Sequence, residues 1–261
     1  MDLIALLGAD SSLQDALGEC TDSSFHFHAA LPDSSAEQIL AALEPLRFAG
    51  AAVLDPGLQA AALGAVTRPS VAAQGAGAVD CVVVTAAGLV GEYTLGQAVG
   101  ELLLASQWNL RGARGVVIGT GPEAKAVARE ASGLGLNHLS VLGEDVSSAE
   151  AITRELAATT KGEYAPLRSP VSMSYIERAD VLVRCDPSAE VPTELLGPHL
   201  SVVDLSPAHL SHLREAALKV GAKSLGARDV WAYQLMLIAR QVLGRHLEAA
   251  PFLELFHSHI S

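Results

Sequence analysis

The sequence predicts a two-domain α/β protein, because short apolar strands alternate with helical segments along most of its length. Residues 115–145 read as a buried strand, a glycine turn, a helix and a second strand, which is the layout of a dinucleotide-binding unit. The chain has 261 residues, half of them hydrophobic, which is enough for two cores. We therefore expect a doubly wound parallel sheet of Rossmann type and an α/β substrate domain, with a cleft between them.

The N-terminal part predicts the substrate domain. Strands are expected at 2–8, 51–54 and 79–85, and helices at 34–48, 58–63 and 95–107. Ser34 offers a cap to the first of these helices, and Asp55-Pro56-Gly57 marks a turn.

Strands and helices alternate more regularly after residue 106, which predicts a parallel sheet covered on both faces. Strands are expected at 115–118, 138–142, 180–184, 201–205 and 223–225, with a weak segment at 163–166, and helices at 122–133, 148–159 and 207–220. An apolar helix at 230–247 is expected to pack back on the first domain. The predicted domains are thus 1–105 completed by 229–261, and 106–228.

The composition of the chain limits the classes of binding partner that we expect. The net charge of −12 argues against nucleic acid or an anionic membrane. No apolar run reaches the ~20 residues of a membrane span, the first residues lack the basic region of a signal peptide, and the three cysteines show no CxxC spacing. We expect a cytoplasmic protein that binds a small-molecule substrate or metabolite, and a homodimer is the candidate assembly.

The glycine turn predicts a cofactor site. Gly119 permits a sharp bend, Gly121 lets a pyrophosphate approach the backbone, and Ala124 keeps the helix close to the strand. Pro122 suits the first helical turn, and free amides there face the phosphates. The predicted cofactor-binding residues of the turn are Gly119, Thr120, Gly121, Pro122, Glu123 and Ala124. The alternative is a Rossmann fold that has lost its ligand, which Glu123 near the phosphate position favours.

An acid follows the second strand, as a dinucleotide site requires. Glu144 or Asp145 stands there, and a carboxylate at this place accepts hydrogen bonds from a ribose 2′-hydroxyl and repels a 2′-phosphate. The predicted cofactor is therefore NAD rather than NADP. The alternative is that both acids cap the next helix.

Further stretches share an order and spacing with a known family. They are Gly77-Ala-Val-Asp80-Cys81, Gly91-Glu-Tyr-Thr94-Leu95-Gly96, Leu110 to Gly119, Ala179 to Pro187, Val203 to Pro207, and the late Gln234. In these stretches the chain resembles the shikimate/quinate dehydrogenase family along nearly its whole length. The resemblance implies two α/β domains with the substrate between them, and hydride transfer between NADP or NAD and a cyclohexene carboxylate.

The same resemblance implies a Lys–Asp pair that handles the proton of the reacting hydroxyl. The position of the Lys is Leu58 and that of the Asp is Leu95, so no catalytic residue is assigned. Tyr93 is the remaining nearby side chain that could donate a proton. The candidate substrate-cleft residues are Ser11, Ser12, Asp80, Thr94, Tyr233 and Gln234.

Three functions stay open. The first is an NAD-preferring oxidoreductase acting on a substrate other than shikimate, since leucines cannot move a proton. The second is a non-catalytic nucleotide- or metabolite-binding relative. The third is a methylene-tetrahydropterin or folate dehydrogenase with a similar domain order.

Two other groups of residues resemble functional sites. His26 and His28 lie one residue apart on one face of a strand, and with His257 and His259 they suggest a metal site. Two histidines at this spacing need a third ligand, so no metal is expected, and solvent-facing strand residues and a loose C-terminal tail are the preferred interpretation. Asp204 with Ser206 suggests a catalytic serine, but the chain has no Gly-x-Ser-x-Gly turn, so a strand end is the preferred interpretation.

Overall fold

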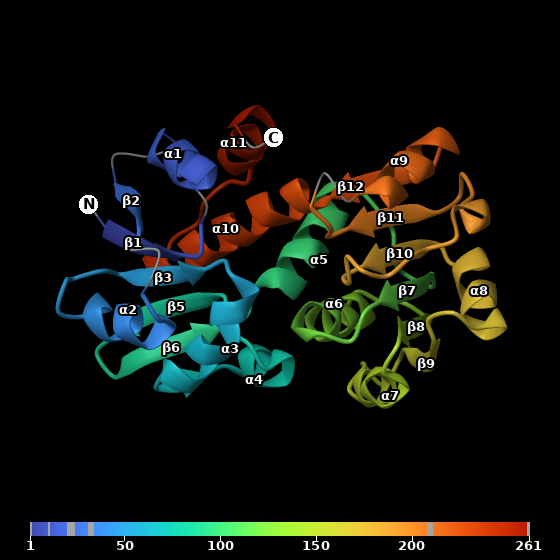
Figure 1. Ribbon diagram of the computed structural model, residues 1–261, viewed down its shortest axis with the longest axis horizontal. Helices are drawn as coiled ribbons and strands as arrows, with labels where there is room; N and C mark the ends of the chain where they lie inside the picture. The colour runs from blue at the N-terminus through green and yellow to red at the C-terminus, as the bar shows by residue number, and fades with distance from the viewer. Residues whose placement is uncertain (1, 10, 20–23, 31–33, 208–210, 260–261) are drawn as a thin grey trace. The chain divides into compact units, whose positions relative to one another are not determined.

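The computed structural model describes residues 2–9, 11–19, 24–30, 34–207 and 211–259 (Figure 1). The chain is α/β, as predicted, and divides into two compact units. Unit 1 comprises Met1–Leu95 and Trp231–Ser261, and unit 2 comprises Gly96–Val230. In the described part of the chain, no helix has the length and apolar character needed to cross a membrane.

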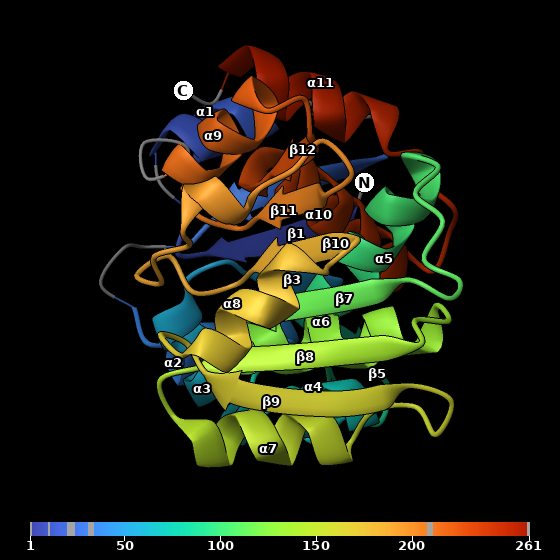
Figure 2. The ribbon, with the colours of Figure 1, turned by 90° about the vertical axis from the view of Figure 1, so that its right-hand side faces the viewer.

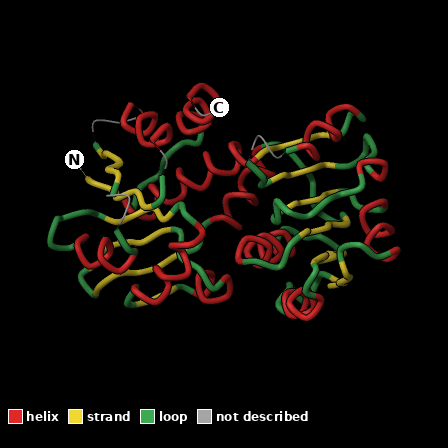
Figure 3. The backbone as a smooth tube through the Cα atoms, in the orientation of Figure 1, coloured by secondary structure: helices red, strands yellow, loops and turns green. Residues whose placement is uncertain are grey.

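Unit 1 contains a mixed six-stranded sheet, drawn in yellow in Figure 3. In the order of the sheet its strands are β2 (Phe25–Ala29), β1 (Asp2–Leu7), β3 (Gly50–Val53), β5 (Cys81–Thr85), β6 (Gly88–Glu92) and β4 (Arg68–Pro69). β1 is parallel to β2 and β3, whereas β5 is antiparallel to β3 and β6. β6 was not predicted, because Gly88 reads as a turn; its φ of +101° closes a hairpin and the strand starts there.

The helices of unit 1 are α1 (Ser11–Glu19), α2 (Ala36–Leu43), α3 (Pro56–Ala65), α4 (Val71–Ala76) and α11 (Ala250–His259), whereas α5 (Leu95–Ala105) and α10 (Ala227–Leu243) each have residues in both units. The cap of α2 is Ser35 rather than Ser34, in a capping box with Gln38. The C-terminal segment is a helix and not the loose tail expected for the last histidines. Phe252, Leu255 and Phe256 have helical spacing and are buried, so packing keeps α11 folded.

Unit 2 contains six parallel strands in the order β12-β11-β10-β7-β8-β9. They are β7 (Arg114–Ile118), β8 (His138–Gly143), β9 (Lys161–Pro166), β10 (Val181–Arg184), β11 (Ser201–Asp204) and β12 (Lys223–Gly226). Numbered along the chain from β7, this is the order 3-2-1-4-5-6 of dinucleotide-binding domains. The fold class predicted from the sequence is therefore confirmed.

Helices cover both faces of this sheet (Figures 1 and 2). α6 (Pro122–Gly133) and α7 (Val146–Arg154) follow β7 and β8, whereas α8 (Pro170–Glu177) and α9 (His212–Lys219) pack on the other face through Ile176 and Leu213. α8 was not predicted because its sequence lacks a regular apolar face: its buried residues are Ser172 and Ile176. Its start is nevertheless marked by a capping box of Ser169 and Ser172 and by Pro170 in the first turn.

Candidate functional site

The glycine turn of unit 2 lies between β7 and α6, where the strand order reverses. Gly119 has φ +124°, a conformation that side chains disfavour, and a Cβ there would lie 3.2 Å from the backbone nitrogen of Asp186. Its N–H donates to the carbonyl of Leu142 over 2.8 Å. The turn is thus held between the ends of β8 and β10, at the switch point where α/β sheets bind ligands.

The start of α6 can receive an anion. Gly121 is its N-cap, no side chain caps it, and Pro122 occupies the first turn. Ala124 is fully buried, which lets the helix lie close to the sheet. The carboxylate of Glu123 lies 3.0 Å from where a Cβ of Gly121 would stand. This acid therefore lies beside the glycine that a pyrophosphate would approach, and it has to turn away for one to bind.

The two acids after β8 have different roles. Asp145 caps α7: one carboxylate oxygen accepts from the N–H and hydroxyl of Ser147, and the other accepts from the hydroxyl of Ser148. These hydrogen bonds lower the pKa of Asp145 to about 2. Glu144 is exposed, and its carboxylate makes no hydrogen bond to the described residues. Glu144 is thus the acid whose carboxylate is available to a ribose.

A buried ion pair at the ends of β10 and β11 was not predicted. The guanidinium of Arg184 donates to both carboxylate oxygens of Asp204, over 2.9 and 2.8 Å, and both side chains are buried. The hydroxyl of Ser211 and the N–H of Ser206 also donate to Asp204. Burial raises the pKa of Asp204, but these hydrogen bonds outweigh it, and the pKa lies below its usual value.

The sequence does carry a signal for this pair. Arg184 and Asp204 each end a short apolar strand, and they face each other in the register of the two strands. Ser206 donates to Asp204 through its backbone N–H and not through its hydroxyl. The hydroxyl of Ser206 is buried and has no hydrogen-bond partner among the described residues.

The candidate site of unit 1 is built around Asp80, which is fully buried. Its carboxylate accepts from the N–H and hydroxyl of Thr94, the N–H of Leu95 and the amide of Gln234, over 2.8 to 3.0 Å. Burial raises the pKa of Asp80 to about 6, against the lowering effect of Gln234, Thr94 and Leu95. The carboxylate thus sits at the start of α5, where the helix dipole favours a negative charge.

Four predicted residues therefore meet in this unit: Asp80, Thr94, Leu95 and Gln234. Tyr93 and Tyr233 neighbour them in the chain and are buried. Leu58 lies in the first turn of α3, and the carbonyl of the next residue, Gln59, accepts from the N–H of Val79. The position of the family's Lys is thus adjacent to the segment that carries Asp80. An acid is present in this site, but at position 80 rather than 95.

Ser11 and Ser12 open α1, and their side chains lie outside the described part of the structure. The backbone before them lies beside the start of α3, because a Cβ on Gly8 would overlap Asp55. Ser11 and Ser12 therefore follow a strand at the same edge of the sheet as Leu58.

The histidines considered for a metal site belong to two different elements. His26 and His28 belong to β2, and His257 is exposed on α11. The side chain of His259 is outside the described part. Within the residues that the structure describes, no group of three or more His, Cys, Asp or Glu side chains could hold a metal ion.

Solved structures of similar fold identify the architecture. A ligand-free 5-ketofructose reductase of Gluconobacter sp. strain CHM43 matches with a TM-score of 0.81 at 21% identity, covering 98% of each chain. Quinate dehydrogenase from Corynebacterium glutamicum in complex with NAD matches with 0.82 at 21%, covering 98% of this chain and 99% of that one. Shikimate 5-dehydrogenase from Thermus thermophilus, in complex with NADP(H) and shikimate, matches with 0.80 at 24% over the whole of both chains.

No family model matches the chain, and no curated protein matches it by sequence. The chain therefore has the fold of the shikimate and quinate dehydrogenases with a strongly diverged sequence. This confirms the resemblance inferred from the motifs at the level of the fold.

Proposed function

We propose that this protein is an oxidoreductase of the shikimate dehydrogenase type that uses a nicotinamide cofactor, prefers NAD, and acts on a substrate other than shikimate. One observation carries the proposal: the strand order of unit 2 places Gly119, with its positive φ, at the switch point of the sheet. The quinate and shikimate dehydrogenases of similar fold were solved in complex with NAD and with NADP(H), respectively.

The cofactor would be held by this chain's own groups. The backbone of Gly119 to Gly121 and the uncapped start of α6 would hold the pyrophosphate, and Glu144 would bind the ribose. The nicotinamide supplies the hydride acceptor or donor. We assign unit 2 to the cofactor and unit 1 to the substrate.

The substrate we propose is a ketone or alcohol with an apolar part. Leu58 and Leu95 stand where the family's Lys and Asp handle a proton and bind a polyol, and neither can form a hydrogen bond with its side chain. A polar substrate would lose about 1–3 kcal/mol of binding free energy for each of its polar groups that finds no hydrogen-bond partner in the site. The Gluconobacter protein of similar fold is a 5-ketofructose reductase, whose ketone substrate is not a cyclohexene carboxylate.

The alternative is a relative that binds a nucleotide or metabolite without turnover. Two observations favour it: Glu123 lies beside Gly121, and leucines occupy the two proton-handling positions. Turnover of any alcohol with NAD separates the two functions.

Calorimetric titration of the protein with NAD and with NADP tests the cofactor site. We expect NAD to bind more tightly than NADP, and Glu144→Arg to reverse the preference by removing the carboxylate and adding a partner for a 2′-phosphate. Gly119→Ala should weaken NAD binding by about tenfold or more, because its Cβ would approach the backbone of Asp186 at an unfavourable φ. The matched control is Gly133→Ala in α6, where a Cβ meets no atom within 4 Å. If neither nucleotide binds the folded protein, the cofactor proposal is wrong.

Restoring the Lys–Asp pair tests whether the frame of the substrate site is intact. The backbone N–H of Leu95 lies 3.0 Å from a carboxylate oxygen of Asp80, so an aspartate at 95 would place two acids close together in a buried site. We therefore expect Leu58→Lys with Leu95→Asp to gain little shikimate-dependent reduction of NAD. Adding Asp80→Asn should raise that rate by roughly 10²-fold over the wild type.

Asp80→Asn alone is the control and should gain nothing, since it supplies no proton-handling pair. A triple variant that folds and binds NAD, yet shows no shikimate-dependent rate, would contradict the proposed substrate frame.

A further inference from the structure

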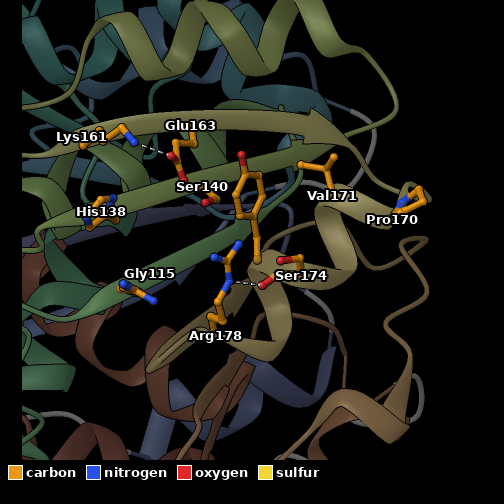
Figure 4. Close-up of a pocket in the computed structure, with 11 residues that line it drawn as sticks. Gly115, His138, Ser140, Lys161, Glu163, Pro170, Val171, Ser174 and Arg178 are labelled. Carbon is orange, nitrogen blue, oxygen red and sulfur yellow. Dashed lines mark hydrogen bonds and ion pairs between the residues drawn. The ribbon is translucent and has the colours of Figure 1, made fainter.

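Unit 2 carries a cavity that the proposed function does not use. It encloses about 580 Å³ and is lined by eleven residues of β7, β8, β9 and of α8 with its flanks (Figure 4). Its volume falls in the range of small-molecule sites, about 300–1,000 Å³. The strand residues that line it include Arg114, His138 and Lys161, which are the first residues of their strands.

The cavity is distinct from the glycine turn. Gly119 follows the last residue of β7, whereas Arg114 is the first, so these two residues lie about 16 Å apart along the strand. The two sites also belong to opposite faces of the sheet, because α8 lines the cavity and α6 begins at the turn. A ligand in one site therefore does not occupy the other.

Cations dominate the lining, although the chain as a whole has a net charge of −12. Arg114, Lys161 and Arg178 are cations, and Glu163 is the one acid among the eleven. Lys161 pairs with Glu163 over 2.8 Å, which raises the pKa of Lys161 and neutralises that acid. Figure 4 shows this pair along β9 and Arg178 reaching toward the strands from α8. The net charge of the lining is thus positive.

Two guanidinium groups offer free donors to this cavity. Arg178 uses Nε to donate to the carbonyl of Ser174 over 2.9 Å, and its two terminal nitrogens donate to no described residue. The side chain of Arg114 likewise has no hydrogen bond or ion pair among the described residues. Planar guanidinium forks are suited to the several oxygens of a phosphate, which they bind through paired hydrogen bonds.

The remaining wall suits an organic group. Val171 lines the cavity, and Tyr175 lines it while packing against the apolar core under α8. We propose that this cavity binds a small organic phosphate, with its phosphate group held by Arg114 and Arg178 and its carbon skeleton against Tyr175 and Val171.

The test uses the full-length protein and glycerol 3-phosphate as the probe, with inorganic phosphate as a second arm. Binding is followed by NMR through the ring resonances of Tyr175 and His138, which report on this cavity and not on the glycine turn. We expect saturable shifts of these rings, tighter binding of the ester than of inorganic phosphate, and binding that persists with NAD present.

Arg114→Gln with Arg178→Gln should weaken binding by about tenfold or more, because both guanidinium forks are lost. Both side chains are exposed, so the fold should persist. The matched control is Arg154→Gln, an exposed arginine on α7 outside the cavity, which should bind like the wild type. Absence of shifts in the two rings, or equal affinity in the double variant, would overturn the proposal. Because NAD binding is measured separately, its failure would leave this result unaffected.

Discussion

Replacing Asp204 by alanine is expected to lower the free energy of unfolding by about 3–5 kcal/mol, as is usual when one partner of a buried ion pair is removed. The variant leaves the guanidinium of Arg184 buried without its carboxylate; both side chains are at most 7% exposed. It also removes the acceptor for Ser211 and for the N–H of Ser206. Chemical denaturation at pH 7 measures the loss.

Two further variants test whether the loss of stability comes from the buried ion pair. Glu150→Ala breaks an exposed pair with Arg154 and should cost less than about 1 kcal/mol. Arg184→Met combined with Asp204→Leu should recover at least half of the loss, because no charge is then left buried. A cost for Asp204→Ala no greater than that of Glu150→Ala would contradict the assignment.

Asp80 is expected to make stability fall as the pH rises from about 4 to about 6. Its pKa is raised to about 6 in the folded chain, so the folded state binds more protons than the unfolded state across this range. Stability from the neutral carboxyl is complete below the unfolded pKa and is lost as the pH passes the folded pKa. The shift corresponds to about 3 kcal/mol.

Because other acids titrate in the same range, the measured quantity is the difference in unfolding free energy between the wild type and Asp80→Asn. This difference should change by up to about 3 kcal/mol between pH 4 and 7. Relative to Asp80→Asn, the wild type should be less stable at pH 7 than at pH 4. Gln234→Leu removes a donor to the carboxylate and should move the midpoint to higher pH. A difference that is flat with pH would show that Asp80 does not titrate here.

Much of the fold could be predicted from the sequence because its signals are local. The apolar run before Gly119, the turn and the helix start at Pro122 all lie within ten residues, and the structure has them as predicted. Elements that were not predicted have weak local signals or depend on partners: the buried residues of α8 are Ser172 and Ile176, and β6 forms by pairing with β5.

The candidate site was harder to predict from the sequence, because its contacts join residues that are far apart in the chain. Gln234 reaches Asp80 across 154 residues, and Arg184 meets Asp204 through the pairing of two strands. Local spacing also left open which of Glu144 and Asp145 caps α7, and only the hydroxyls of Ser147 and Ser148 decide it.

The buried position of Asp80 also couples ligands to solvent acidity. With a pKa of about 6, its carboxyl is partly protonated in weakly acidic solution. An anion that comes to rest near it favours the protonated form, so its binding takes a proton from the buffer, whereas a neutral ligand need not do so. If unit 1 binds the substrate, as proposed, the carboxyl at this position therefore makes its occupancy by anionic compounds sensitive to pH.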